Sequence, residues 1–192
     1  RDLMELIEAL FLRVVTDVTK DPVLTLNENQ ITLTPPFPRR PFRDLVLEAS
    51  GIDIARIDDD GLRDVLKRIS PPLKEGEREG VWSRGKLIDE LYKTTTRPKI
   101  IQPTFVIDHP VELSPLAKRR QEDPTTVERF QLVIGGMEVV NAFSELNDPI
   151  DQRERFEEQQ AAKTAGDTEA MVVDEDFLHA LEVGMPPTAG LG

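Results

Sequence analysis

Polar and aromatic side chains interrupt an otherwise apolar stretch that ends near residue 145. They are Gln131, Glu138, Asn141, Phe143 and Glu145. Burying an unpaired charge is costly, so carboxylates in such a stretch either face water or meet a cation. The residue types therefore leave two interpretations open: the solvent-exposed face of a surface hairpin, or a site that binds a cationic ligand.

Gly135-Gly136 lies between two β-prone runs, 130–134 and 137–143. A two-residue glycine turn between such runs predicts an antiparallel hairpin. The turn sets the expected register, in which Ile134 lies opposite Met137, Val133 opposite Glu138 and Gln131 opposite Val140. In this register Gln131 and Glu138 project from the same face of the hairpin.

Strict alternation along the second strand places Asn141, Phe143 and Glu145 together on one face. Glu138 has the wrong parity to join them. All of these side chains can converge on one site only if a β-bulge near Val139-Val140 shifts the register by one residue. A site built from both strands thus requires that irregularity.

Helical and strand patterns account for much of the remaining chain. Apolar residues at spacings of three and four predict helices, and short runs rich in branched residues predict strands. The expected helices are 2–19, 43–50, 85–95, the charged helix 149–165, which stops at Gly166, and 174–183, which begins at a cap from Asp174 and ends at Gly184. The expected strands are 23–26, 30–33 and 100–107, where Pro103 indicates an edge or an irregularity.

The segment 51–83 differs in character from its surroundings. Asp58-Asp59-Asp60 offers caps to a helix that ends near Ile69, and the charged stretch from Lys74 to Gly80 follows Pro71-Pro72. We interpret this segment as a small helical insertion with a mobile loop.

Locally paired strands with helices around them, and no βαβ rhythm, predict an α+β fold in which helices flank an antiparallel sheet. The same order of elements argues against a Rossmann-type nucleotide fold. The hydrophobic content of 39% is enough to build a core, so a disordered chain is excluded.

The net charge of -12 argues against holding nucleic acid by general electrostatics alone. The absence of cysteine excludes disulfides, thiolate zinc sites and a cysteine nucleophile, and it fits a cytoplasmic location. No apolar run is long enough to span a bilayer, so we expect no membrane partner.

Several longer motifs occur in a characteristic order. They are Ile101-Gln102-Pro103-Thr104-Phe105, Ser114-Pro115-Leu116-Ala117, the segment from Asn141 to Pro149 followed by Asp151-Gln152, Asp174-Glu175-Asp176, and the segment from Gly184 to Gly192. Together they resemble the catalytic domain of bacterial-type class II lysyl-tRNA synthetases. The resemblance covers residues 1–192, from just after motif 2 of that family to the first glycines of motif 3.

The resemblance implies a partial catalytic domain that activates lysine with ATP and passes the lysyl group to lysine tRNA. By position, Asn141, Phe143 and Glu145 would line the lysine pocket, with Glu145 as the anion for the substrate ammonium. Glu138, with Gln131, would bind the Mg²⁺ that bridges the ATP phosphates; a carboxylate suits this hard cation. Gly190 and Gly192 would lie close to ATP.

Two positions depart from the family pattern. Gln131 stands where the family commonly has a second metal-binding glutamate, and Met137 where it commonly has an arginine. The resemblance assigns no catalytic side chain to this segment, because the arginines of motifs 2 and 3 fall outside it. We therefore expect the isolated 192-residue segment to be inactive and the parent protein to be a homodimer.

Alternatives remain open at this point. A related enzyme would attach lysine to elongation factor P instead of tRNA, and a truncated paralogue would be a binding module without catalysis. The basic run Lys118-Arg119-Arg120 would contact phosphate or RNA, or else form a solvated loop. His109 and His179 are too far apart in sequence to suggest a metal pair, so core or surface roles are expected.

Overall fold

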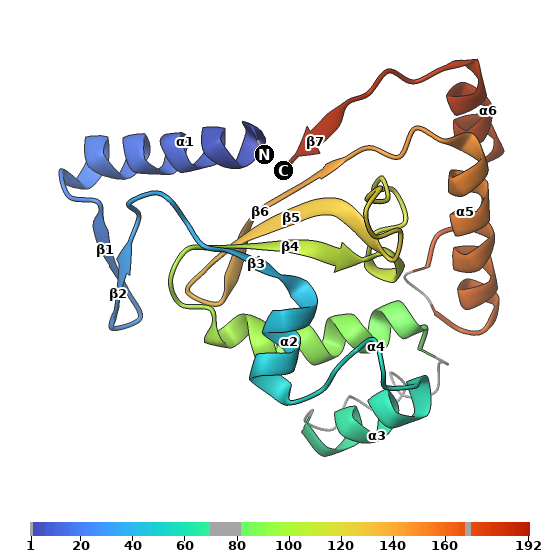
Figure 1. Cartoon of the computed structure of the whole chain (residues 1–192), viewed down its shortest axis with the longest axis horizontal. Coiled ribbons are helices and arrows are strands. Elements are labelled where there is room, and N and C mark those ends of the chain that lie inside the picture. Colours follow the sequence, from blue (N-terminus) through green and yellow to red (C-terminus); the bar gives the residue numbers. More distant parts are fainter. Residues whose placement is uncertain (1, 70–81, 168–169) are drawn as a thin grey trace.

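The computed structural model describes residues 2–69, 82–167 and 170–192. A five-stranded sheet with the order β3-β4-β5-β6-β7 forms its centre, and a separate two-stranded sheet joins β1 and β2 (Figure 1). The strands are β1 Val23–Leu26, β2 Asn29–Thr32, β3 Arg39–Pro41, β4 Thr104–Pro110, β5 Thr126–Ile134, β6 Met137–Ser144 and β7 Ala189–Leu191. The α-helices are α1 Asp2–Thr19, α2 Phe42–Ser50, α3 Asp59–Ile69, α4 Arg84–Leu91, α5 Pro149–Thr164 and α6 Glu175–Val183.

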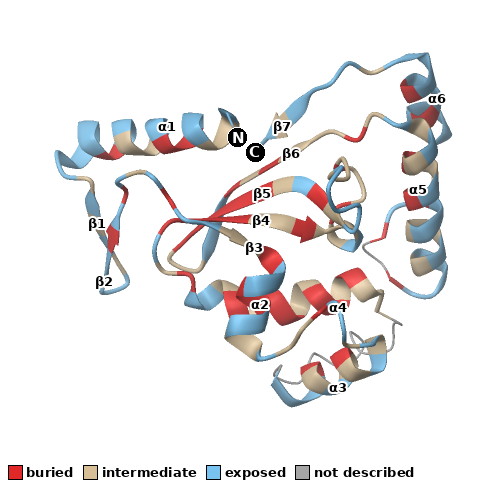
Figure 2. Cartoon of the chain, in the orientation of Figure 1, coloured by how far each residue is buried: buried red, intermediate tan, exposed pale blue. Residues whose placement is uncertain are grey.

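The two faces of the central sheet pack against different helices. Phe105 and Leu132 point into a core that they share with Ile7 and Val15 of α1. Val133 points the other way, into a core formed with α2, α3 and α4. Figure 2 shows the buried residues concentrated where these helices meet the strands. The alternation of side chains along each strand thus gives the sheet two apolar faces.

The α+β prediction is confirmed, with one refinement. The pairings from β4 to β7 are antiparallel, whereas β3 runs parallel to β4 at one edge of the sheet. The expected helices are all present, and the Asp174 side chain caps α6 by accepting a hydrogen bond from the Phe177 amide. None of the helices in the described residues has the length and apolar character that a membrane span requires.

The expected strand 100–107 is wrong at its beginning. A short 3₁₀ turn, Arg97–Lys99, precedes a loop, and β4 begins only at Thr104. Pro103 has no amide hydrogen for a ladder and lies just before the strand. Because β4 lies between β3 and β5, Pro103 does not mark an edge. Ile100 is buried among the α2 and α4 side chains, which is why this branched stretch resembles a strand in sequence.

The segment 51–83 contains α3, as expected. Asp58 accepts a hydrogen bond from the Gly61 amide at 2.8 Å and so caps this helix. The charged stretch from Lys74 to Gly80 lies outside the described residues. Trp82 packs against the same core as Tyr92, which joins the end of the segment to the sheet. That the segment is an insertion remains a prediction.

The glycine hairpin carries the irregularity on which a shared site depends. Gly135 and Gly136 both have positive φ, as the tight turn requires. Ile134 pairs with Met137 and Val133 with Glu138, as predicted. The predicted pairing of Gln131 with Val140 is wrong. Gln131 lies opposite Asn141, because Val139 is an extra residue on β6 and shifts the register.

Candidate active site

The bulge brings side chains of β5 and β6 onto one face of the sheet. Gln131 lies opposite Asn141, and its Nε2 donates a hydrogen bond to Glu138 Oε2 at 2.7 Å. Without the bulge, Glu138 would share a face with Val140 rather than with Asn141. This face is the one that α2 and α4 cover, because Val133 of the same strand lies in their core. The bulge that a shared site would require is therefore present.

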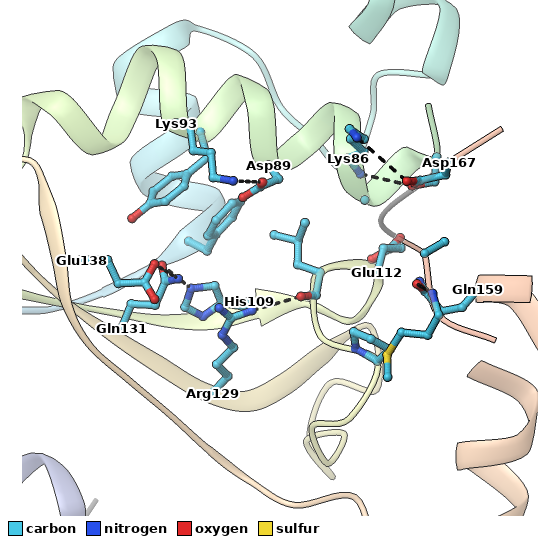
Figure 3. Close-up of a pocket in the computed structure, with 18 residues that line it drawn as sticks. Lys86, Asp89, Lys93, His109, Glu112, Arg129, Gln131, Glu138, Gln159 and Asp167 are labelled. Atoms are coloured by element: carbon cyan, nitrogen blue, oxygen red, sulfur yellow. Dashed lines mark hydrogen bonds and ion pairs between the residues drawn. The ribbon is translucent and has the colours of Figure 1, made fainter. Parts of the chain in front are cut away.

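A cavity of about 390 Å³ opens beside these residues, between the sheet and α4. Gln131, Glu138, His109 and Arg129 line its sheet side, and Lys93 lies on its helix side (Figure 3). Lys93 is paired with Asp89 at 2.5 Å. The cavity is polar at its rim and holds charges of both signs.

Arg129 is a residue of this face that the sequence analysis did not single out. Its Nε donates to Asn141 Oδ1 at 2.9 Å, and its Nη1 donates to the Leu113 carbonyl at 3.0 Å and to Ser114 Oγ at 2.8 Å. Burial lowers the pKa of Arg129, and the nearby Glu138 carboxylate opposes that shift. Within the described ranges, the Asn141 NH₂ group donates no hydrogen bond and so keeps its donors for a ligand. Arg129 comes two residues before Gln131 and therefore shares its face of the strand. That spacing is the feature of the sequence that could have identified Arg129.

Glu145 lies beside Gly190 of β7. Phe143 pairs with Gly190 across the two strands, and a Cβ placed on Gly190 would lie 2.6 Å from Glu145 Oε1. Burial raises the pKa of Glu145. Within the part of the chain that the structure describes, the Glu145 carboxylate makes no ion pair or side-chain hydrogen bond. It is a partly desolvated anion that lacks a cationic partner.

The candidate residues form two neighbouring groups rather than one cluster. Gln131 and Glu138 line the cavity beside α4, whereas Phe143 lines a second cavity of about 680 Å³. Arg129 borders both cavities. Through its bond to Asn141 it connects the two groups along the sheet.

Gly190→Ala tests the position of the Glu145 carboxylate. The added methyl group would displace Oε1, the end of a flexible side chain, so we expect little loss of stability. A misplaced binding group is costly to function, by up to about 10²-fold for a shift near 1 Å. We expect the KM for the substrate that contacts Glu145 to rise while the melting temperature stays close to that of the unmodified protein. An unchanged KM for that substrate would contradict the contact.

Gly192 makes a backbone pair with Asn141. Its amide donates to the Asn141 carbonyl at 2.9 Å, and its carbonyl accepts from the Asn141 amide at 2.8 Å. A Cβ on Gly192 would meet open space, so the lack of a side chain there is not required by any described residue. Its assignment to ATP remains a prediction.

No group of three or more acidic, histidine or cysteine side chains within the described ranges forms a metal cage. Mg²⁺ is commonly held by one or two carboxylates together with substrate phosphates and water. Glu138, an exposed carboxylate at the mouth of the polar cavity, fits that second arrangement. The donor set therefore suits a nucleotide-borne Mg²⁺ and does not suit an ion held by protein side chains alone.

Two arginines of the basic run 118–120 bind acidic side chains, and the two histidines differ in burial. Arg119 donates to Asp151 at 3.1 Å, and Arg120 is paired with Asp108. His109 is fully buried, while His179 is exposed on α6. The core and surface roles expected for the two histidines are confirmed.

The comparisons of this chain with protein families and with known proteins agree with each other. The sequence model of the tRNA synthetases class II (D, K and N) family matches residues 1–192. The lysine–tRNA ligase of Moorella thermoacetica is 43% identical over 99% of this chain and 38% of its own length. Those of Thermoanaerobacter sp. (strain X514) and Prochlorococcus marinus (strain MIT 9313) are each 46% identical over 99% and 100% of the chain. The chain spans 37–38% of the length of these relatives.

Proposed function

Because this chain belongs to the class II tRNA synthetases of the D, K and N type, we propose that the protein activates lysine with ATP and transfers the lysyl group to lysine tRNA. The relatives at 43–46% identity carry the name lysine–tRNA ligase. None of the observations favours transfer to elongation factor P or a binding module without catalysis. The proposal concerns the complete gene product, since the matched relatives are longer than this chain.

The unpaired Glu145 carboxylate is the observation that carries the choice of lysine. Aspartate would bring a second anion to this carboxylate, and asparagine would bring no charge. Lysine is the one amino acid of the three whose side chain is a cation. A partly desolvated anion gains most from a cationic partner, because Coulomb energy rises as water is excluded. Glu145 therefore favours the lysine ammonium.

Asn141 and Phe143 complete the proposed lysine pocket. Asn141 offers its NH₂ group as a donor because Arg129 already occupies its oxygen. Phe143 shares a face of β6 with Asn141, and Glu145 comes directly after that strand. Phe143 would supply an apolar wall for the lysine methylenes. The three side chains thus match a substrate with a polar head, an alkyl stem and a charged end.

Glu138 would hold Mg²⁺ together with ATP, and Gly190 and Gly192 would allow ATP to approach the backbone of β7. The ion would neutralise negative charge that gathers on the departing pyrophosphate. Glu138 contributes one carboxylate at the cavity mouth, and Arg129 lies close enough for its pKa to respond to Glu138. This part of the site would orient the triphosphate relative to the lysine carboxylate.

The proposal also includes a homodimeric assembly and a cytoplasmic location. The family resemblance supports the dimer, and a sequence without cysteine is consistent with a reducing compartment. Light scattering during size-exclusion chromatography of the complete gene product measures the assembly directly.

Amino-acid-dependent ATP–pyrophosphate exchange tests the proposed activity. We expect the complete gene product to exchange pyrophosphate with lysine and to show no comparable rate with aspartate or asparagine. It should then charge a lysine tRNA transcript with labelled lysine. Exchange that depends on asparagine or aspartate would overturn the choice of substrate. Lysine transfer to elongation factor P, with no charging of tRNA, would overturn the choice of acceptor.

A further inference from the structure

Three side chains from neighbouring strands form a hydrogen-bonded row beside the cavity. His109 of β4 lies with Nε2 3.2 Å from Gln131 Oε1, and Gln131 Nε2 lies 2.7 Å from Glu138 Oε2 (Figure 3). His109 is 1% exposed and Gln131 is 6% exposed, whereas Glu138 is exposed. The row runs from the core outward to the carboxylate at the cavity mouth.

The chemistry of each partner fixes the direction of these bonds. An ionised carboxylate only accepts hydrogen bonds, so Gln131 must present its NH₂ group to Glu138. Its oxygen then faces His109, and His109 Nε2 must carry the hydrogen that it donates. His109 Nδ1 is then unprotonated. It makes no hydrogen bond of good geometry among the described residues, although the Arg129 backbone lies close enough to affect the pKa of His109.

The surroundings of His109 keep the imidazole neutral. Burial, and to a lesser extent the Arg129 guanidinium, lower the pKa of His109 to about 3, against the opposing effects of the Gln131 side chain and the Arg129 carbonyl. The ring also packs against Phe42 at a centroid distance of 5.2 Å. A neutral ring held on an aromatic neighbour has a fixed orientation.

We propose that Gln131 does not bind the metal but, held by His109, is a positioning residue that fixes the Glu138 carboxylate for Mg²⁺-bound ATP. The inference rests on the proposed function, which assigns Glu138 to that ion. A cation at Glu138 would meet the Gln131 NH₂ group, which has no lone pair for coordination. The Gln131 oxygen points away from Glu138, toward His109.

This arrangement fixes the orientation of the Glu138 carboxylate. Glu138 is exposed next to the bulge, so its side chain would otherwise sample several rotamers, and ordering a glutamate side chain costs conformational entropy. The bond from Gln131 holds one carboxylate oxygen and leaves Oε1 for the cation. A glutamate at position 131 would place two acceptor groups at this contact, whereas glutamine supplies the donor.

The tautomer of His109 is the direct test. Nitrogen-15 NMR of the histidine-labelled complete gene product distinguishes a ring protonated at Nε2 from one protonated at Nδ1. We expect the Nε2–H form, both without ligand and with Mg²⁺ and a non-hydrolysable ATP analogue. An Nδ1–H form in the presence of Mg²⁺ and the analogue would overturn the proposal. That form would donate toward the Arg129 carbonyl, accept from the Gln131 NH₂ group and turn the Gln131 oxygen toward the metal.

A matched pair of variants tests the effect on binding. His109→Gln keeps a donor near the position of Nε2, whereas His109→Phe removes it and retains a ring for Phe42. Groups that orient a metal ligand typically contribute about 10- to 100-fold to metal affinity or activity. We expect His109→Phe to weaken Mg²⁺-dependent binding of the ATP analogue by that factor, measured by calorimetry, and His109→Gln to restore most of it. Equal affinity in the two variants would overturn the positioning role.

Glu138→Gln separates this inference from the proposed function. Loss of Mg²⁺-dependent analogue binding in Glu138→Gln, with no loss in His109→Phe, would overturn only the positioning role. Unchanged binding in Glu138→Gln would overturn the assignment of Glu138 to the ion. If His109→Phe does not fold, the tautomer of the unmodified protein still decides the question.

Discussion

Glu145→Gln is expected to abolish most lysine activation, with the loss appearing in the KM for lysine. Removing one partner of a buried charge pair costs about 2–5 kcal/mol, and Glu145 is only partly buried, so we expect a fall in affinity at the lower end of that range, roughly 30-fold. The KM for ATP should change much less, because Glu145 lies apart from the Glu138 cavity. Lysine-dependent pyrophosphate exchange at varied lysine and ATP concentrations measures both constants.

Glu158→Gln is the matched control for that variant. It removes the same charge, but Glu158 is exposed on α5 and lines neither cavity. We expect nearly unchanged kinetics. A Glu145→Gln protein with a lower maximal rate and an unchanged lysine KM would remove Glu145 from the lysine pocket.

The pH dependence of lysine binding follows from the direction of the Glu145 shift. Burial raises the pKa of Glu145 above its ordinary value, so its carboxylate gains a proton at a higher pH than an exposed one. The lysine ammonium attracts the ionised form. Lysine affinity should therefore weaken as the pH falls through the raised pKa, and this dependence should be absent from Glu145→Gln.

Arg155→Leu is expected to cause the largest loss of stability. Arg155 is 2% exposed, binds both Asp151 oxygens at 3.0 and 2.9 Å, and donates to the carbonyls of Ser114 and Ala117 at 3.0 and 2.6 Å. Breaking a buried pair by removing one partner costs about 3–5 kcal/mol. A melting temperature lower by roughly 6–20 °C should follow for a chain of this size.

Arg153→Leu provides the control on the same helix. Arg153 binds Glu175 through two bonds of 2.9 and 2.8 Å, but both side chains are exposed. Exposed pairs contribute little, so a much smaller change in melting temperature is expected. Asp151→Asn added to Arg155→Leu should recover part of the loss, because it removes the uncompensated carboxylate. Equal melting temperatures for the two single variants would contradict the role of the buried network.

Acid should weaken the same network. Burial alone would raise the pKa of Asp151, but the hydrogen bonds and charges of Arg155 and Arg119 outweigh it, and the net shift is downward. A carboxylate whose pKa is lower in the folded state than in the unfolded state stabilises the fold at pH values above its unfolded pKa, about 3.9. That stabilisation is lost as the pH falls through the pKa of the folded state. Thermal melts below pH 4 should therefore show a shallower loss in Arg155→Leu than in the parent protein.

The loop that Arg155 holds also supports the site. Arg155 binds the Ser114 carbonyl, and Ser114 Oγ accepts from Arg129, which in turn orients Asn141. The network on α5 is thus connected to the proposed lysine pocket through three successive hydrogen bonds. A higher lysine KM in Arg155→Leu at temperatures well below its melting point would reveal that connection.

Sequence alone determined most of the elements of this protein and the class of its fold, but not the short strands β3 and β7. Local signals set them: apolar spacing indicated α1, Pro149 and Gly166 bounded the charged helix α5, the Asp174 cap and Gly184 bounded α6, and Gly135-Gly136 indicated the turn between β5 and β6. The strand was predicted to begin too early, at residue 100. Ile100 is a buried, branched residue of the kind that strands favour, although it lies in a loop.

Tertiary structure decided which side chains meet. Val139 is an extra residue because of how β6 pairs with β5 and β7. Residue types alone do not predict that pairing. The role of Gln131 depends on His109, which lies 22 positions earlier in the chain and reaches it only because β4 and β5 are neighbours. Arg129 likewise became a site residue through its contacts with Ser114 and Asn141. Side-chain type follows from sequence, but hydrogen-bond direction requires the partner that folding brings alongside.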